Sequence, residues 1–237
     1  MGKIFLIPTP LGPSADRNLV LPAANREIIN RIDYFVVENV RTARRFLAKC
    51  QLDKTIDELT FAELNEHTPV EEVEALLAPL LREGRDIGVM SEAGLPCVAD
   101  PGALLVAAAH RKGIEVCPLS GPSSITLALM ASGANGQSFA FNGYLPVKPA
   151  ERAQAIRRFE RRALAERQTQ IFIETPYRNR KLFDEIIAVC APKTMLCVAC
   201  DLMEPNQYIR TLTVEAWKKQ GAPAIDKRPA IFILFGI

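Results

Sequence analysis

Short apolar runs alternate with amphipathic stretches along the first half of the chain. Lys3–Pro8 and Tyr34–Glu38 have the pattern of buried strands, and Ala23–Ile32 between them has the apolar spacing of a helix. The same alternation continues through a strand at Ile87–Met90, a helix at Ala103–Arg111, a strand at Ile114–Pro118 and a helix at Ile125–Ala131. Strands that alternate with helices predict a mostly parallel sheet covered on both faces.

The pattern changes in the second half of the chain. Strands are predicted at Phe139–Leu145, Gln170–Glu174, Met195–Cys200, Tyr208–Leu212 and Ala230–Phe235, with helices at Ala150–Glu166 and Arg180–Cys190. The last three strands have little helix between them, which favours a mixed sheet. The sequence therefore predicts two α/β domains, 1–120 and 121–237, without a Gly/Ser linker between them.

The most informative loop follows the predicted strand Ile87–Met90. About nine residues, Ser91 to Ala99, separate this strand from Asp100-Pro101, which has the composition of a helix start. Ordinary connections have a median near ~5 residues, so this loop is expected to be functional. It carries neither of the glycine-rich fingerprints of dinucleotide and nucleoside triphosphate sites.

Three other loops join this one at the same edge of the predicted sheet. Pro8–Gly12, Glu38–Ala43 and Pro118–Ser124 each follow a predicted strand and contain Pro, Gly or polar residues. Because the carboxyl ends of parallel strands meet at one edge, these loops are expected to form a ligand site.

Composition and charge limit the partners that the protein is expected to bind and the cellular compartment in which it is expected to act. The net charge of +2 gives no general attraction to nucleic acid or membrane, and no apolar run approaches the roughly 18 residues of a membrane span. The apolar run before Pro8 is too short for a secretory signal. Six scattered cysteines in apolar contexts suit reduced thiols, so a cytoplasmic protein without a metal centre is expected.

A set of short motifs spread along the chain resembles one known family. They are Pro8-Thr9-Pro10-x-Gly12, Arg41-Thr42, Glu66-His67, Ser91-x-Ala93-Gly94-x-Pro96, Asp100-Pro101-Gly102, Gly121-Pro122, Gly143-Tyr-Leu-Pro146 and Glu174-x-Pro-x-Arg178. In this order they are similar to the tetrapyrrole methylase superfamily of S-adenosylmethionine-dependent methyltransferases. Within it, the chain most resembles the bacterial branch that methylates the cytidine 2′-hydroxyl of small-subunit ribosomal RNA.

The resemblance implies two α/β domains with S-adenosylmethionine in the cleft between them, and usually a homodimer. Carried over position by position, it implies cofactor contacts from Pro8, Gly94, Leu95, Pro96, Val98, Ser123, Ser124 and Glu174. Backbone contacts would explain the small residues of the loop, since large side chains would block close approach. Glu174 and Arg178 would clamp cofactor or substrate, or form a salt bridge with each other.

Four side chains at this edge are candidates for catalysis: Glu38, Arg41, His67 and Glu92. Removal of a hydroxyl proton needs a nearby acceptor, and His67 suits this best because an unperturbed imidazole has a pKa near ~6.5. The alternative for His67 is a solvated residue at a helix start. Arg41 could bind a phosphate or a carboxylate bidentately or be a surface charge, and Glu38 could position Arg41.

A basic stripe lies on the predicted helix Ala150–Glu166. Arg157, Arg158, Arg161 and Arg162 share one face, which could bind a phosphate backbone, although a solvated outer face is favoured.

Three functions remain open. The favoured one is methylation of ribosomal RNA or the small ribosomal subunit. The others are carbon methylation of a tetrapyrrole precursor, permitted by Leu95 where relatives carry a polar residue, and a non-catalytic module that binds S-adenosylmethionine.

Overall fold

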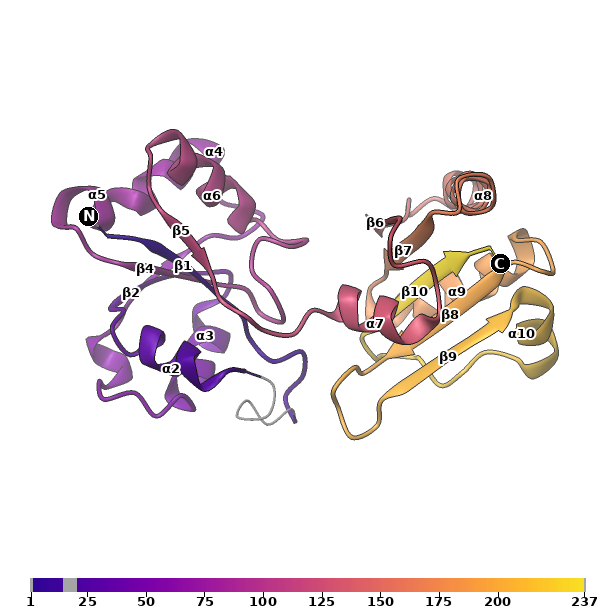
Figure 1. Ribbon diagram of the computed structural model, residues 1–237, viewed down its shortest axis with the longest axis horizontal. Helices are drawn as coiled ribbons and strands as arrows, with labels where there is room; N and C mark the ends of the chain where they lie inside the picture. The colour runs from indigo at the N-terminus through magenta and orange to yellow at the C-terminus, as the bar shows by residue number, and fades with distance from the viewer. Residues whose placement is uncertain (1, 15–20, 237) are drawn as a thin grey trace. The chain divides into compact units, whose positions relative to one another are not determined.

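The computed structural model describes residues 2–14 and 21–236 of the chain. Contacts divide it into two compact units, Met1–Ser123 and Ser124–Ile237 (Figure 1). Among the residues that the structure describes, no helix is both long and apolar enough to span a bilayer.

The sheet of the first unit is entirely parallel, as the alternation predicts. Its strands are β1 (Ile4–Ile7), β2 (Tyr34–Val37), β3 (Thr60–Glu63), β4 (Ile87–Met90) and β5 (Val116–Pro118), in the order β3-β2-β4-β1-β5. Ile7 and Val37 both pair with Met90, so β1, β2 and β4 end level with one another. The loops after these three strands therefore leave the sheet at one edge.

Helices cover both faces of this sheet (Figure 1). They are α2 (Ala23–Ile29), α3 (Val40–Ala48), α4 (Val70–Val73), α5 (Ala78–Glu83) and α6 (Gly102–Arg111), with 3₁₀ turns η1 (Ile56–Glu58) and η2 (Glu74–Leu77). Successive strand residues point to opposite faces, so Val36 packs in a core with Leu105 of α6, whereas Phe35 packs with Leu47 of α3. This two-sided burial explains the continuous apolar runs of the central strands.

The second unit contains a mixed sheet, also as predicted. Its strands are β6 (Phe139–Tyr144), β7 (Thr169–Ile173), β8 (Met195–Cys200), β9 (Tyr208–Thr213) and β10 (Ala230–Phe235), in the order β6-β7-β10-β8-β9. β6 and β7 are parallel and the other pairs are antiparallel. The helices are α7 (Ser124–Ser132), α8 (Pro149–Ala165), α9 (Asn179–Val189) and α10 (Val214–Gln220), with a 3₁₀ turn η3 (Pro176–Arg178).

Three helices supply the core of the second unit. Phe159 of α8, Phe183 of α9 and Trp217 of α10 pack with the strands in one buried cluster. The indole of Trp217 donates a hydrogen bond of 2.8 Å to the carbonyl of Leu196. This bond satisfies the polar atom of a fully buried side chain.

The basic stripe of α8 lies on the exposed face of that helix, and an acidic residue next to it in the sequence does not. Arg157, Arg158, Arg161 and Arg162 are all exposed. Glu160, however, is buried, where it accepts hydrogen bonds from the Ala191 amide at 2.6 Å and the Thr194 hydroxyl at 2.5 Å. Its carboxylate therefore ties α8 to the segment before β8, and does not belong to the charged outer face.

Candidate active site

A two-residue bridge joins the loops that follow β1 and β4. The Thr9 amide donates to the Gly94 carbonyl at 2.9 Å, and the Gly94 amide donates to the Thr9 carbonyl at 3.1 Å. Two of the segments that the resemblance assigns to the cofactor are thus brought into contact. Both main-chain polar groups of Gly94 are used in this bridge, which leaves the second lone pair of its carbonyl oxygen for a further hydrogen bond.

The loop after β4 is held in an unusual backbone conformation. Gly94, Cys97 and Ala99 have φ angles of 81°, 68° and 66°, and such values cost energy for the two residues that have a Cβ. The Asp100 carboxylate fixes the loop by accepting the amides of Cys97 at 2.7 Å and Gly102 at 3.2 Å. Conformations of this kind gather at ligand sites, where the surrounding structure enforces them.

Burial changes the titration of two side chains in this loop. It raises the pKa of the Asp100 carboxyl, although the two amide donors oppose the shift. It also raises the pKa of the Cys97 thiol to about 12, helped by the nearby Asp100 charge. Cys97 is therefore a neutral thiol at physiological pH and not a nucleophile.

A close approach of Pro8 and Gly121 completes this part of the first unit. A Cβ added to Gly121 would lie 2.3 Å from the ring atoms Cβ and Cγ of Pro8, which is too close for any side chain. Pro8 itself is buried. The glycine therefore lets the segment after β5 touch the end of β1.

Replacing Gly121 by alanine tests whether this contact matters. The new methyl group would push Pro8 away, so we expect a loss of about 1–3 kcal/mol in the free energy of unfolding, with weaker binding of the cofactor that the resemblance implies, S-adenosylmethionine. Gly136→Ala is the matched control, because a Cβ there has no atom within 4 Å. Chemical denaturation and calorimetric titration would measure both quantities, and equal behaviour of the two variants would contradict the expectation.

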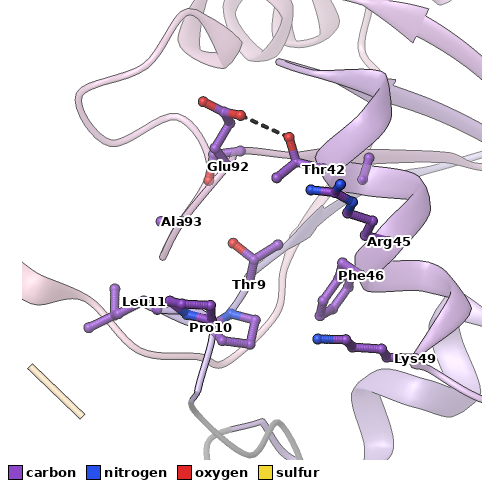
Figure 2. Close-up of a pocket in the computed structure, with 13 residues that line it drawn as sticks. Thr9, Pro10, Leu11, Thr42, Arg45, Phe46, Lys49, Glu92 and Ala93 are labelled. Carbon is purple, nitrogen blue, oxygen red and sulfur yellow. Dashed lines mark hydrogen bonds between the residues drawn. The ribbon is translucent and has the colours of Figure 1, made fainter. Parts of the chain in front are cut away.

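A cavity of about 680 Å³ opens beside these loops (Figure 2). Its lining residues come from three places: Thr9, Pro10, Leu11, Gly12 and Pro13 after β1, Thr42, Ala43, Arg45, Phe46 and Lys49 on and just after α3, and Ser91, Glu92 and Ala93 after β4. The Thr42 hydroxyl donates to the Glu92 carboxylate at 2.8 Å, which orients that carboxylate at the rim. The cavity thus combines a carboxylate, two cations and an apolar wall.

Glu38 and Glu92 are the two catalytic candidates that the structure brings together. The Glu92 amide donates to the Glu38 carboxylate at 3.3 Å, so Glu38 supports the main chain of the residue that lines the cavity. Burial raises the pKa of the Glu38 carboxyl, the hydrogen bond from the Glu92 amide opposes this shift, and the nearby charges of Asp100, Glu92 and Glu66 reinforce it.

Arg41 and His67 lie outside this cavity. Arg41 is exposed on α3. The His67 side chain lies on a turn after β3, where it is 85% exposed and its Nε2 is 3.7 Å from the Glu66 carboxylate. This exposed position agrees with the alternative interpretation of His67 as a solvated residue.

The residues that the resemblance assigns to the cofactor differ in exposure. In the first unit, Gly94, Pro96 and Ser123 are buried, Leu95 is half-buried and Val98 is exposed. In the second unit, Ser124 begins α7. Glu174 is buried there and accepts hydrogen bonds from the Thr175 amide at 2.6 Å and from Arg178 at 2.7 Å, so the salt bridge considered for this pair is present.

Sequence reasoning placed Thr9 and Ser91 in the loops of the site, but it missed Pro13, Arg45, Phe46 and Lys49. Phe46 and Lys49 follow Thr42 at helical spacings of four and seven residues, which places all three on one face of α3. This helical spacing was the sequence signal that could have identified Phe46 and Lys49 as cavity residues.

Across residues 2–14 and 21–236, no three His, Cys, Asp or Glu side chains are grouped so that they could hold a metal ion.

Comparisons with known proteins agree with this architecture. The family model described as Tetrapyrrole (Corrin/Porphyrin) Methylases matches residues 10–216. A relative from Escherichia coli O157:H7, named ribosomal RNA small subunit methyltransferase I, is 31% identical over 92% of this chain and 73% of its own length. A Thermotoga maritima relative of the same name is 32% identical over 80% of this chain and 78% of its own length.

Solved structures show the same fold. The methyltransferase CobJ has a TM-score of 0.66 at 17% identity, covering 100% of this chain and 95% of that one. The cobalt precorrin-4 methyltransferase CbiF has a TM-score of 0.60 at 16% identity, covering 98% and 94%. The protein is therefore a methyltransferase built from two α/β units. More particularly, the chain belongs to the tetrapyrrole methylase family.

Proposed function

We propose that the protein transfers a methyl group from S-adenosylmethionine to a ribose 2′-hydroxyl of small-subunit ribosomal RNA. The observation that carries this proposal is the 31% identity, over 92% of the chain, to a relative named ribosomal RNA small subunit methyltransferase I. A cavity with Arg45 and Lys49 in its wall supports an anionic substrate.

We propose cofactor contacts in each of the two units. In the first unit they are Pro8, Gly94, Leu95, Pro96, Val98 and Ser123, and in the second they are Ser124 and Glu174. The loop after β4 fits such a ligand because Gly94 has a φ of 81° and an added Cβ would lie 3.2 Å from Leu11. When bound, S-adenosylmethionine supplies an electrophilic methyl group on a sulfonium.

The chain's own residues would handle the acceptor hydroxyl. We place Glu92 as the proton acceptor, because its carboxylate lines the cavity and is oriented by Thr42. Glu38 would position Glu92 through the main chain. Arg41 would contact a phosphate, and His67 would be the proton acceptor only if the substrate reached its exposed turn.

Carbon methylation of a tetrapyrrole precursor is the second candidate. Arg45 and Lys49 would suit its carboxylates as they suit phosphates.

Transfer of a radiolabelled methyl group from S-adenosylmethionine tests these functions directly. Small ribosomal subunits, naked ribosomal RNA and uroporphyrinogen would be offered in parallel, and we expect label in RNA that maps to a ribose. Label in the tetrapyrrole would select the second candidate. Cofactor binding in a titration with label in no acceptor would favour a non-catalytic module.

We also propose an oligomeric state and a cellular location for the protein. We infer a homodimer that acts in the cytoplasm, where ribosomal RNA is found. Sedimentation equilibrium would give about twice the monomer mass of 26.2 kDa if this is right.

A further inference from the structure

We propose that the cavity in Figure 2 binds one nucleotide of the acceptor RNA strand, with Arg45 and Lys49 contacting successive phosphates and Phe46 contacting the base. This inference rests on the proposed function and deepens it, because it assigns to Arg45, Phe46 and Lys49 separate contacts with the phosphates and base of the substrate. It treats the cavity as an RNA site and not as the pocket of the cofactor.

The two cations are available for a ligand. Arg45 and Lys49 are both exposed, and neither forms an ion pair with a carboxylate in the part of the chain that the structure describes. Arg44, their neighbour on α3, is different because it pairs with Asp57 at 2.6 Å and lies over the Phe61 ring. Arg45 and Lys49 are one helical turn apart, about 6 Å along the axis, which suits two phosphates of one strand.

Charge distinguishes the RNA strand from the cofactor as the occupant. S-adenosylmethionine carries a sulfonium and an ammonium, which Arg45 and Lys49 would repel, and a single carboxylate. An RNA strand carries one negative charge per nucleotide, so both cations gain from binding it. Glu92, the acidic residue in the lining, already accepts a hydrogen bond from Thr42 at the rim.

The shape of the apolar wall suits a flat base. Phe46 lies between Arg45 and Lys49, and Figure 2 shows it facing the segment Pro10–Leu11 across the cavity. An aromatic ring opposite apolar side chains gives an unstacked base two surfaces to contact.

Two buried hydroxyls give an independent indication of a polar ligand. Thr9 is 4% exposed and Ser91 is 9% exposed, and both line the cavity. Neither Oγ1 of Thr9 nor Oγ of Ser91 has a hydrogen-bond partner among the described residues. Buried hydroxyls are normally paired, so these two are expected to bond to polar atoms of the occupant.

The test uses the salt dependence of RNA binding, which a purely structural role would not change. Binding of a fluorescent single-stranded RNA with a small-subunit ribosomal RNA sequence would be measured at several salt concentrations, with the protein saturated in S-adenosylmethionine. Each lost phosphate contact lowers the slope of log affinity against log salt by about 0.7. For the Arg45→Ala/Lys49→Ala variant we therefore expect a slope reduced by about 1.4, and RNA affinity lower by about tenfold or more.

Controls separate this subsite from the cofactor site and from general charge effects. Arg82→Ala removes an exposed arginine of α5 outside the cavity and should leave the slope unchanged. The affinity of the double variant for S-adenosylmethionine alone should equal that of the wild type. A loss of cofactor affinity with an unchanged slope would overturn the proposal and place the cofactor in this cavity.

The outcomes also distinguish this inference from the proposed function. If the wild type methylates RNA and the double variant keeps both its slope and its KM for RNA, the subsite is wrong while the function stands. If the wild type transfers no methyl group to RNA, the function fails, and the subsite fails with it.

Discussion

Replacing Glu92 by glutamine is expected to lower kcat for RNA methylation by about 10²–10⁴-fold, with the KM for RNA and the affinity for S-adenosylmethionine close to wild type. Glutamine keeps the shape of the side chain and can still accept the hydrogen bond that Thr42 donates at 2.8 Å. It cannot take up a proton, so an interaction needed only in the transition state is lost. Single-turnover methyl transfer with saturating cofactor and RNA would measure the chemical step.

The comparison variant is His67→Asn, which removes the other proton acceptor considered for this site. Its side chain is 85% exposed and lies outside the lining of the cavity, so we expect kcat to stay within about threefold of wild type. The opposite result, with His67→Asn inactive and Glu92→Gln active, would move the base to His67 and require that the RNA reaches the turn after β3.

The fold was largely predictable because the buried strands are almost wholly apolar. All four residues of β2 and of β4 are buried, and such runs are visible in the sequence. β3 was missed for the converse reason. Its ends are exposed and its two central residues are only half-buried, as expected for an edge strand, so Thr60–Glu63 has no continuous apolar run.

The Asp100-Pro101 motif correctly predicts a helix start, but its residues take different positions from those expected. The sequence predicts that Asp100 caps the helix with Pro101 in the first turn. The helix instead begins at Gly102 after Pro101, and the Asp100 carboxylate accepts the Gly102 amide while also holding the Cys97 amide of the preceding loop. One side chain serves both elements, which local spacing alone does not indicate.

The sequence predicted the loops that line the cavity but not the side chains that α3 contributes to it. Glycine, proline and strand ends located the loops after β1 and β4, because the backbone demands of such loops restrict their composition. Arg45 and Lys49 look like any charged outer face of a helix, since sequence does not show which cations have carboxylate partners. The unpaired hydroxyls of Thr9 and Ser91 depend on what surrounds them in three dimensions.

Replacing Arg152 by methionine is expected to lower the free energy of unfolding of the second unit by about 3–5 kcal/mol. The Arg152 side chain is 2% exposed and forms a two-point ion pair with Glu185, with its Nη2 2.6 Å from that carboxylate. Its Nη1 also donates to the carbonyls of Val147 at 3.1 Å and Pro146 at 3.3 Å, which lead into α8. The variant would leave a half-buried carboxylate and two carbonyls without their donor.

The single tryptophan provides the measurement, because Trp217 is buried in the core of the second unit and its fluorescence reports the unfolding of that unit in denaturant. Arg157→Met is the control, since Arg157 is exposed on the same helix and should change stability by no more than about 0.5 kcal/mol. The ion pair with Arg152 lowers the pKa of the Glu185 carboxyl, so its contribution is present above the ordinary glutamate pKa and is lost as pH falls through the lowered value. The difference between wild type and Arg152→Met should therefore shrink in acid. A difference below about 1 kcal/mol at neutral pH would show that this ion pair does not stabilise the unit.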